Sequence, residues 1–350
     1  MPFDDRTFPA PAGDALRDRR LLAGWLFSLC GMILVMIVLG GATRLTGSGL
    51  SIMEWAPLTG ALPPLSDAEW QRLYHLYQQI PQYELLNRGF GLAGFKQIFW
   101  LEWVHRLWGR LLGIAFVAPL LWLLWRRAVP RSMLPRLLLL FALGGLQGAV
   151  GWFMVASGFF PDSTAVAPAR LVVHLALALV LYAALLWTGL GVLRPAATGE
   201  SPPGMRRVAQ ALAVLVPLTM LAGAWVAGLH AGLTYNTFPL MDGRLVPEGY
   251  AALTPFLRNF AENIATVQFN HRLLATLTAL IAAGAVAMGA GLPHVRAASL
   301  ALGGVVALQY LLGVLTLLWV VPVPLAVAHQ AVAVLALTAS LVLLHTLRRA

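Results

Sequence analysis

Charged residues are scarce in this chain of 350 residues: only 11% are charged, whereas 59% are hydrophobic. A soluble domain carries about 25% charged residues, so this chain has too little polar surface to coat a globule of its size. Lys96 is the only lysine, and the arginines behind the net charge of +10 lie in short clusters between apolar runs. This distribution indicates a membrane protein, and it argues against a nucleic-acid partner.

Cysteine is almost absent as well. Cys30, the single cysteine, lies in an apolar run, which excludes an intrachain disulfide, a CxxC motif and covalent attachment of a c-type haem. Residues 1–20 contain four aspartates, unlike an acid-poor mitochondrial transit peptide, and they precede a full-length span rather than a short signal-peptide core. The sequence therefore favours a bacterial cytoplasmic (inner) membrane.

Eight apolar runs are long enough to cross a bilayer, which takes about 20 residues at a rise of 1.5 Å each, and lipid requires them to be helices or a closed barrel. The runs show no period-2 alternation, so they are predicted helices. The arginines concentrate on one side of the spans, which predicts cytoplasmic N- and C-termini. The predicted spans are residues 21–42, 98–125, 136–157, 170–193, 208–228, 264–290, 297–320 and 325–347.

The two halves of the sequence resemble each other. GSGLSIMEWAPLTG after the first span has a counterpart in HAGLTYNTFPLMDG after the fifth, and EWVHRLWGRLLG has one in QFNHRLLATLTA. An even number of spans separates the copies, so the repeat is parallel. We expect an all-α integral membrane protein with a cytoplasmic tail (1–20) and two pseudo-symmetric four-helix bundles (21–193 and 208–350) joined by a cytoplasmic linker (194–207).

Four of the eight histidines lie early in the even-numbered spans, at one depth near the outer boundary. Polar side chains in lipid usually face a partner or a cavity, and two imidazoles on facing helices can bind one haem iron from both sides. The pattern predicts two porphyrin sites, one in each half. Hydrogen bonds between helices, zinc binding and proton relay are the alternatives. The predicted metal ligands are His105 and His174 in the first half and His271 and His329 in the second.

Arginines directly follow the first histidine of each pair. Arg106 follows His105, and Arg272 follows His271. A guanidinium group binds carboxylates such as haem propionates through paired hydrogen bonds. Extension of these side chains to the outer lipid headgroups is the alternative.

One acidic residue distinguishes the halves. Glu102 lies one turn before His105, where the second half has Gln268. A carboxylate at one site and an amide at the other predict chemistry at the first site and electron transfer at the second, unless Glu102 is a surface carboxylate at the outer interface. The glycine-rich segment 40–60, which includes Arg44, is a candidate cap over the first site, because glycine lets backbone approach a ligand closely.

Together these motifs resemble the haem A synthase family. The resemblance covers nearly the whole chain from about residue 22 and rests on GGATRLTGSGLS, EWVHR, GAVGWFMVASG, the late NHR and the histidines of the fourth and eighth spans. It implies oxidation of a methyl group of haem O to the formyl group of haem A, by successive hydroxylations with oxygen from water. Electrons would pass through a haem b cofactor.

The resemblance also implies roles for the site residues. It places the family's essential glutamate on Glu102, which would stabilise a cationic intermediate at the methyl carbon or manage protons there. The substrate, haem O, would be held near His105 and His174. Arg106 of the EWVHR motif and Arg44 of the GGATRLTGSGLS motif would belong to the same site. The haem b site would comprise His271, His329 and Arg272.

Some family members carry a cysteine pair in the first outer loop, but this chain has none there. A mechanism that needs a thiol or disulfide in that loop is therefore excluded. The partners implied are haem O, haem A and the lipid bilayer. A haem O synthase, cytochrome oxidase assembly factors and a second copy of the chain are further candidates.

Two other functions stay open at this point. A di-haem b-type cytochrome for electron transfer would keep the four histidines but would not need Glu102 on one side only. A transporter would use the repeat but not the ring of histidines.

Overall fold

The structure is a computed structural model that describes residues 13–193 and 203–348. Within these residues, eight helices are long and apolar enough to cross a membrane, which confirms the predicted all-α, multi-span architecture. They are α1 (Gly13–Leu45), α4 (Gly91–Trp125), α5 (Leu134–Val155), α6 (Pro168–Leu193), α7 (Pro203–Gly228), α9 (Ile264–Gly289), α10 (Pro293–Leu318) and α11 (Val323–Thr346).

The helix boundaries extend beyond some of the predicted spans. Helix α1 includes residues 13–20, which we expected to be a tail, because Ala, Leu and Arg there are good helix formers although several neighbours are charged. It continues to Leu45, so Arg44 lies on its last turn rather than in a loop. Gly47 follows with a φ of 67°, a backbone conformation that commonly ends a helix.

The predicted linker 194–207 falls mostly outside the described residues, which exclude 194–202. Its last part, from Pro203, already belongs to α7. Proline is well suited to the first turn of a helix because its missing N–H has no partner there in any case.

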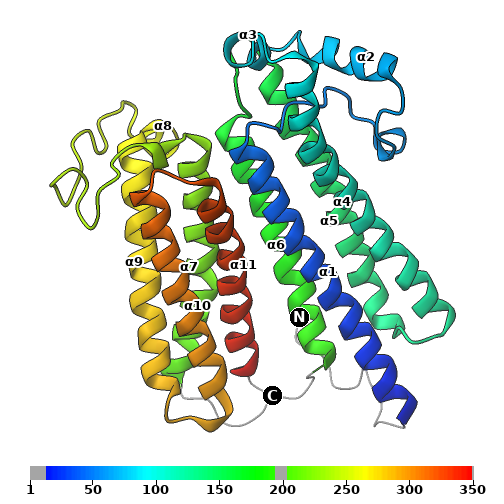
Figure 1. The fold of residues 1–350 in the computed structure, drawn as a ribbon. Coiled ribbons are helices and arrows are strands. Elements are labelled where there is room, and N and C mark those ends of the chain that lie inside the picture. Colours follow the sequence, from blue (N-terminus) through cyan, green and yellow to red (C-terminus); the bar gives the residue numbers. More distant parts are fainter. Residues whose placement is uncertain (1–12, 194–202, 349–350) are drawn as a thin grey trace.

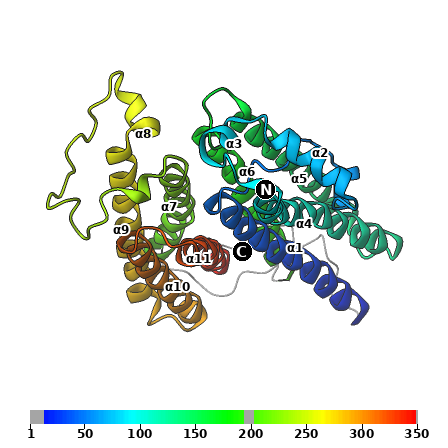
Figure 2. The same ribbon diagram turned by 45° about the horizontal axis from the view of Figure 1, so that its top comes forward.

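The long helices form two groups, as both views show: α1, α4, α5 and α6 lie on one side, and α7, α9, α10 and α11 lie on the other (Figures 1 and 2). Helices α1 and α6 face α7 and α11 where the groups meet. Hydrogen bonds cross this junction: the hydroxyl groups of Tyr182 and Thr338 lie 2.6 Å apart, and Gln330 donates to the carbonyl of Ile37 at 2.9 Å.

The segment between α1 and α4 contains helices that the hydropathy pattern did not predict. Helix α2 (Asp67–Tyr77) begins after Ser66, whose hydroxyl accepts a hydrogen bond from the Glu69 amide; this is the first half of a capping box. Its apolar face joins residues of α4 in a second hydrophobic cluster, with the Trp70 and Phe99 ring centroids 4.9 Å apart. The SDAE sequence at 66–69 is the signal that would have predicted this helix.

The remaining elements are short. Helix α3 (Pro81–Leu86) follows α2 at the top of the view in Figure 1, and α8 (Asn259–Glu262) lies in the segment between α7 and α9. The single-turn elements are η2 (Thr59–Ala61), η3 (Arg131–Met133), η4 (Ala156–Phe159), η5 (Ala231–Leu233) and η6 (Phe256–Arg258).

Candidate functional site

Each of the four predicted histidine ligands lies directly on a glycine of the preceding long helix. A Cβ atom added to that glycine would come within 3.1 Å of the imidazole of His105 and within 2.9 Å of the other three. Only a glycine lets backbone and ring approach so closely. The pairs are Gly40 with His105, Gly151 with His174, Gly223 with His271, and Gly313 with His329.

The predicted pairs of histidines come from helices of the same group. The imidazoles of His105 and His174 are near enough to interact electrostatically, and so are those of His271 and His329. All four side chains are partly buried. Within the described residues, no group of three or more His, Cys, Asp or Glu could hold a metal ion, so these sites offer two imidazoles rather than the fuller ligand set of a zinc centre.

Polar groups of neighbouring helices contact three of the four imidazoles. His271 donates through Nδ1 to the carbonyl of Thr219 at 3.1 Å, which leaves its Nε2 free to bind a metal. Nε2 of Gln147 donates to the carbonyl of His174 at 3.0 Å and lies 3.2 Å from its Nδ1. Nε2 of Gln309 lies 3.4 Å from Nε2 of His329.

Sequence reasoning missed these neighbours, although a signal was present. Gln147 precedes Gly151 by four residues, and Gln309 precedes Gly313 by the same spacing, so each pair lies on one helix face. The repeated Q-x-x-x-G spacing in the third and seventh spans could have identified both glutamines and both glycines.

Glu102 is buried, with only 2% of its surface exposed. Its Oε2 accepts hydrogen bonds from the Ser51 amide (2.7 Å), the Ser51 hydroxyl (2.7 Å) and the Ile52 amide (3.0 Å). Its Oε1 accepts from Nε and Nη2 of Arg106 at 3.1 and 2.6 Å. The alternative of a surface carboxylate at the outer interface is therefore wrong.

Arg106 also binds the loop that follows α1. Its Nη1 donates to the carbonyl of Glu54 at 2.8 Å, and its Nη2 donates to that of Ile52 at 2.7 Å. The guanidinium lies 5.5 Å from the ring centroid of Trp152 on α5, against which Trp55 of the loop stacks at 6.2 Å. The loop is thus tied to α4 and packed on α5. With most of its donors in these bonds, Arg106 is held by protein rather than extended to headgroups.

The second half repeats this arrangement with different chemistry. Arg272 donates to the carbonyls of Tyr235 and Thr237 at 2.6 and 2.8 Å and to Oε1 of Gln268 at 2.7 Å. Gln268 donates in turn to the carbonyl of Thr234 at 2.7 Å. The buried Nε of Arg272 has no hydrogen-bond partner within the described residues.

Arg44 differs from the other predicted arginines. It lies partly buried in the last turn of α1, and within the described part of the chain no hydrogen bond or ion pair engages its guanidinium. His230, beyond the end of α7, adopts a φ of 53°. Partial burial and the nearby charge of Arg44 hold the pKa of His230 below its usual value. The two side chains come from different halves, and Arg44 is the charged member of the pair.

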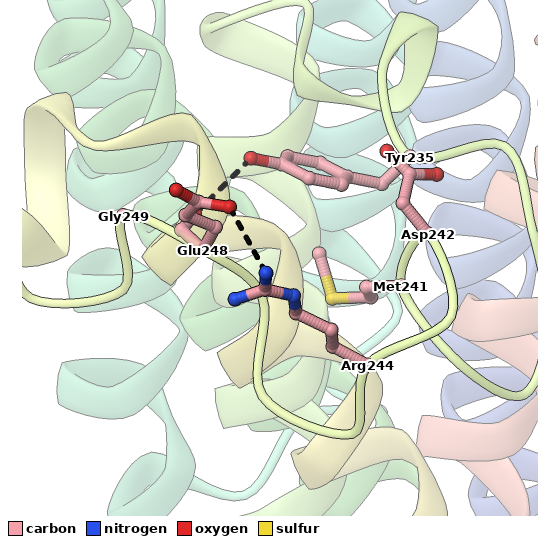
Figure 3. Close-up of a pocket in the computed structure, with 6 residues that line it drawn as sticks. All are labelled: Tyr235, Met241, Asp242, Arg244, Glu248 and Gly249. Carbon is pink, nitrogen blue, oxygen red and sulfur yellow. Dashed lines mark hydrogen bonds and ion pairs between the residues drawn. The ribbon is translucent and has the colours of Figure 1, made fainter.

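A cavity of about 420 Å³ lies in the segment between α7 and α9. Figure 3 shows the Tyr235 hydroxyl donating to the carbonyl of Glu248 and the ion pair between Arg244 and Glu248 in its wall. None of the predicted site residues lines this cavity. Its lining residues are Tyr235, Met241, Asp242, Arg244, Glu248 and Gly249.

A family model described as cytochrome oxidase assembly protein, COX15-CtaA, matches residues 23–341. The chain belongs to this family. All of the predicted site residues, from Arg44 to His329, lie inside the range that the COX15-CtaA model matches.

Relatives within the family share most of the length of the chain. The "Heme A synthase" of Granulibacter bethesdensis is 63% identical over 341 residues, which are 95% of this chain and 89% of that protein. "Heme A synthase 2" of Acidiphilium cryptum is 47% identical over 332 residues (92% and 90%). The "Heme A synthase" of Nitrosospira multiformis is 44% identical over 349 residues (98% of each).

Proposed function

We propose that this COX15-CtaA protein is a haem A synthase, an oxidoreductase that converts haem O to haem A in a multi-pass membrane fold. Relatives with this activity in their names support the proposal over almost the full chain. The observation that carries it is the difference between the two halves: both have a histidine pair, but only the first has a buried carboxylate, Glu102, one turn from a ligand.

The residues present fit a haem in each half. Each bundle has two histidines that lie against a glycine, and the imidazoles of each pair are near enough to interact electrostatically. Several buried polar atoms around them have no hydrogen-bond partner within the described residues, namely Oε1 of Gln147, Oε1 of Gln309 and Nδ1 of His329. Buried polar atoms are rarely left unpaired, so these atoms favour sites that bind a further polar group.

We assign the two pairs different ligands. His105 and His174 would hold the substrate, haem O, and His271 and His329 would hold a haem b cofactor. When bound, haem b supplies one-electron transfer, and haem O supplies the methyl group that becomes the formyl group. The matching contacts of the two halves support the parallel repeat on which this assignment depends.

Glu102 would act at the substrate as a fixed negative group. All of its hydrogen-bond partners are donors, so both carboxylate oxygens are acceptors. Of the two roles that the family resemblance implies, the geometry therefore favours stabilisation of developing positive charge over proton transfer.

The arginines would bind propionate groups to different extents. Arg44 has an unengaged guanidinium, so it is the best candidate for a substrate propionate. Arg272 retains an unpaired Nε for the cofactor. Arg106 has most of its donors in bonds to the loop, so its contribution to the substrate site would be mainly to hold that loop in place.

The distribution of arginines supports a bacterial cytoplasmic membrane with both termini in the cytoplasm and the histidine sites near the outer surface. A haem O synthase that supplies the substrate and an assembly factor that receives haem A are the partners that this function implies. A second copy of the chain is a further candidate partner.

Pigment extraction from the purified protein tests the proposal. Reverse-phase chromatography of the extract should show haem O or haem A beside haem B. Haem B alone would instead support a di-haem electron carrier, and absence of haem would support a transporter. In Glu102→Ala, haem binding should largely persist while haem A formation falls about 100-fold or more. Unchanged haem A formation would remove Glu102 from catalysis.

A further inference from the structure

The same two side-chain positions fasten the outer loop in both halves. One position is three residues before the first histidine of each half, and its side chain contacts the loop. The other is the arginine directly after that histidine, which contacts both the loop and the first side chain. In the first half, Glu102 accepts hydrogen bonds from Ser51 and Ile52. In the second half, Gln268 donates to the carbonyls of Ala231 and Thr234, at 2.6 and 2.7 Å.

At equivalent places, the loop of one half presents hydrogen-bond donors to the helix and the loop of the other half presents an acceptor. We call this property the loop polarity. Arg106 donates to the carbonyls of residues 52 and 54, and Arg272 donates to those of residues 235 and 237. The same spacing makes Ser51 the counterpart of Thr234. At that position the first loop turns an N–H and a hydroxyl toward α4, whereas the second loop turns a carbonyl toward α9.

A carboxylate offers only acceptors, whereas an amide has one donor end and one acceptor end. Both side chains must present an acceptor to the following arginine, because a guanidinium only donates. The other end must then match the loop, which calls for an acceptor at position 102 and a donor at position 268. An amide at position 102 would place its NH₂ group against either the Ser51 and Ile52 amides or Arg106.

We propose that Ser51 is a positioning residue for the reaction, whose hydroxyl and amide aim the Glu102 carboxylate, and that loop polarity dictates glutamate in the first half and glutamine in the second. Ser51 is 2% exposed, so water cannot replace its hydroxyl without rearrangement of the loop. The consequence for haem A formation rests on the proposed function. The match between each loop and the side chain at position 102 or 268 does not depend on the proposed function.

The first test removes the Ser51 hydroxyl from the full-length protein. Ser51→Ala should lower kcat for haem A formation on the order of 10- to 100-fold, the loss of one hydrogen bond to a charged group, with little change in KM. Hydrogen exchange of the 48–56 backbone should rise. Thr59→Ala removes an exposed hydroxyl from the same segment and is the matched control. If both variants behave alike in kcat and exchange, the assignment of Ser51 is overturned.

The second test exchanges the polarity of each site. Glu102→Gln should raise exchange at 48–56, and Gln268→Glu should raise it at 231–237, each without affecting the other loop. Ser51→Ala should raise hydrogen exchange at 48–56 by some amount in the wild type and by a smaller amount in Glu102→Gln. The increment is smaller there because the hydroxyl acts through the carboxylate, which Glu102→Gln already lacks. The proposal would be refuted if the effects of Ser51→Ala and Glu102→Gln on exchange were fully additive. It would also be refuted if neither Glu102→Gln nor Gln268→Glu raised exchange in its loop.

The exchange readout separates this inference from the proposed function. A wild-type protein that forms no haem A would overturn the proposed function, and the exchange measurements would still decide whether Ser51 and loop polarity hold Glu102.

Discussion

Gly313→Ala should displace the His329 imidazole and weaken the binding of haem b. A Cβ at position 313 would lie 2.9 Å from Cε1 of His329, whereas carbon atoms in contact lie about 3.5–4.0 Å apart. The ring would have to move by about 0.6 Å or more to restore contact distance. Metal–ligand distances tolerate only about 0.2 Å, so the displacement exceeds what the bond to iron can absorb.

We expect the affinity for haem b to fall about 10- to 100-fold, as for other changes that misorient a metal ligand. Gly304→Ala, on the same helix, is the control, since a Cβ there has no neighbour within 4 Å and alanine favours a helix by about 1 kcal/mol over glycine. The assay is haem content per purified protein together with the low-spin absorbance spectrum. Full haem content and an unchanged spectrum in Gly313→Ala would refute the claim that this glycine positions His329 on the iron.

Two further predictions concern the junction of the halves. Arg44→Leu should raise KM for haem O about tenfold through loss of a charge-assisted hydrogen bond, while haem b content stays constant; an unchanged KM would exclude Arg44 from substrate binding. Gln330→Leu should lower the thermal stability of the protein by about 1 kcal/mol, the net value of one hydrogen bond, and a melting temperature equal to that of the wild type would show that the bond to Ile37 contributes nothing.

The spans were predictable because lipid imposes a long apolar run on each helix. The ends of the helices were less predictable. Helix α4 begins at Gly91 rather than at residue 98, because hydropathy does not register polar helix formers such as Lys96 and Gln97. Helix α2 was missed for a related reason: it is amphipathic and packs on α4, and only its N-terminal cap marked it in the sequence.

The positions of the four histidines in the earlier part of their helices were predictable, because each lies early in an apolar run. Their partners were not, since Thr219 and Gln309 lie on other helices whose rotation about their own axes does not follow from hydropathy. The importance of Glu102 was visible from its contrast with Gln268. Its bonds to Ser51 were not, because they require the loop after α1 to fold back onto α4.

Gln330 makes the last helix a shared part of both halves. It follows the proposed ligand His329 on α11, and its amide donates to Ile37 on α1, one turn before Gly40, which lies against His105. A Cβ on the adjacent Gly41 would overlap the Gln330 side chain. A chimera that takes α11 from a relative must therefore take α1 from the same donor, since a mismatched pair would disturb the packing of α1 beside His105 while it replaced His329.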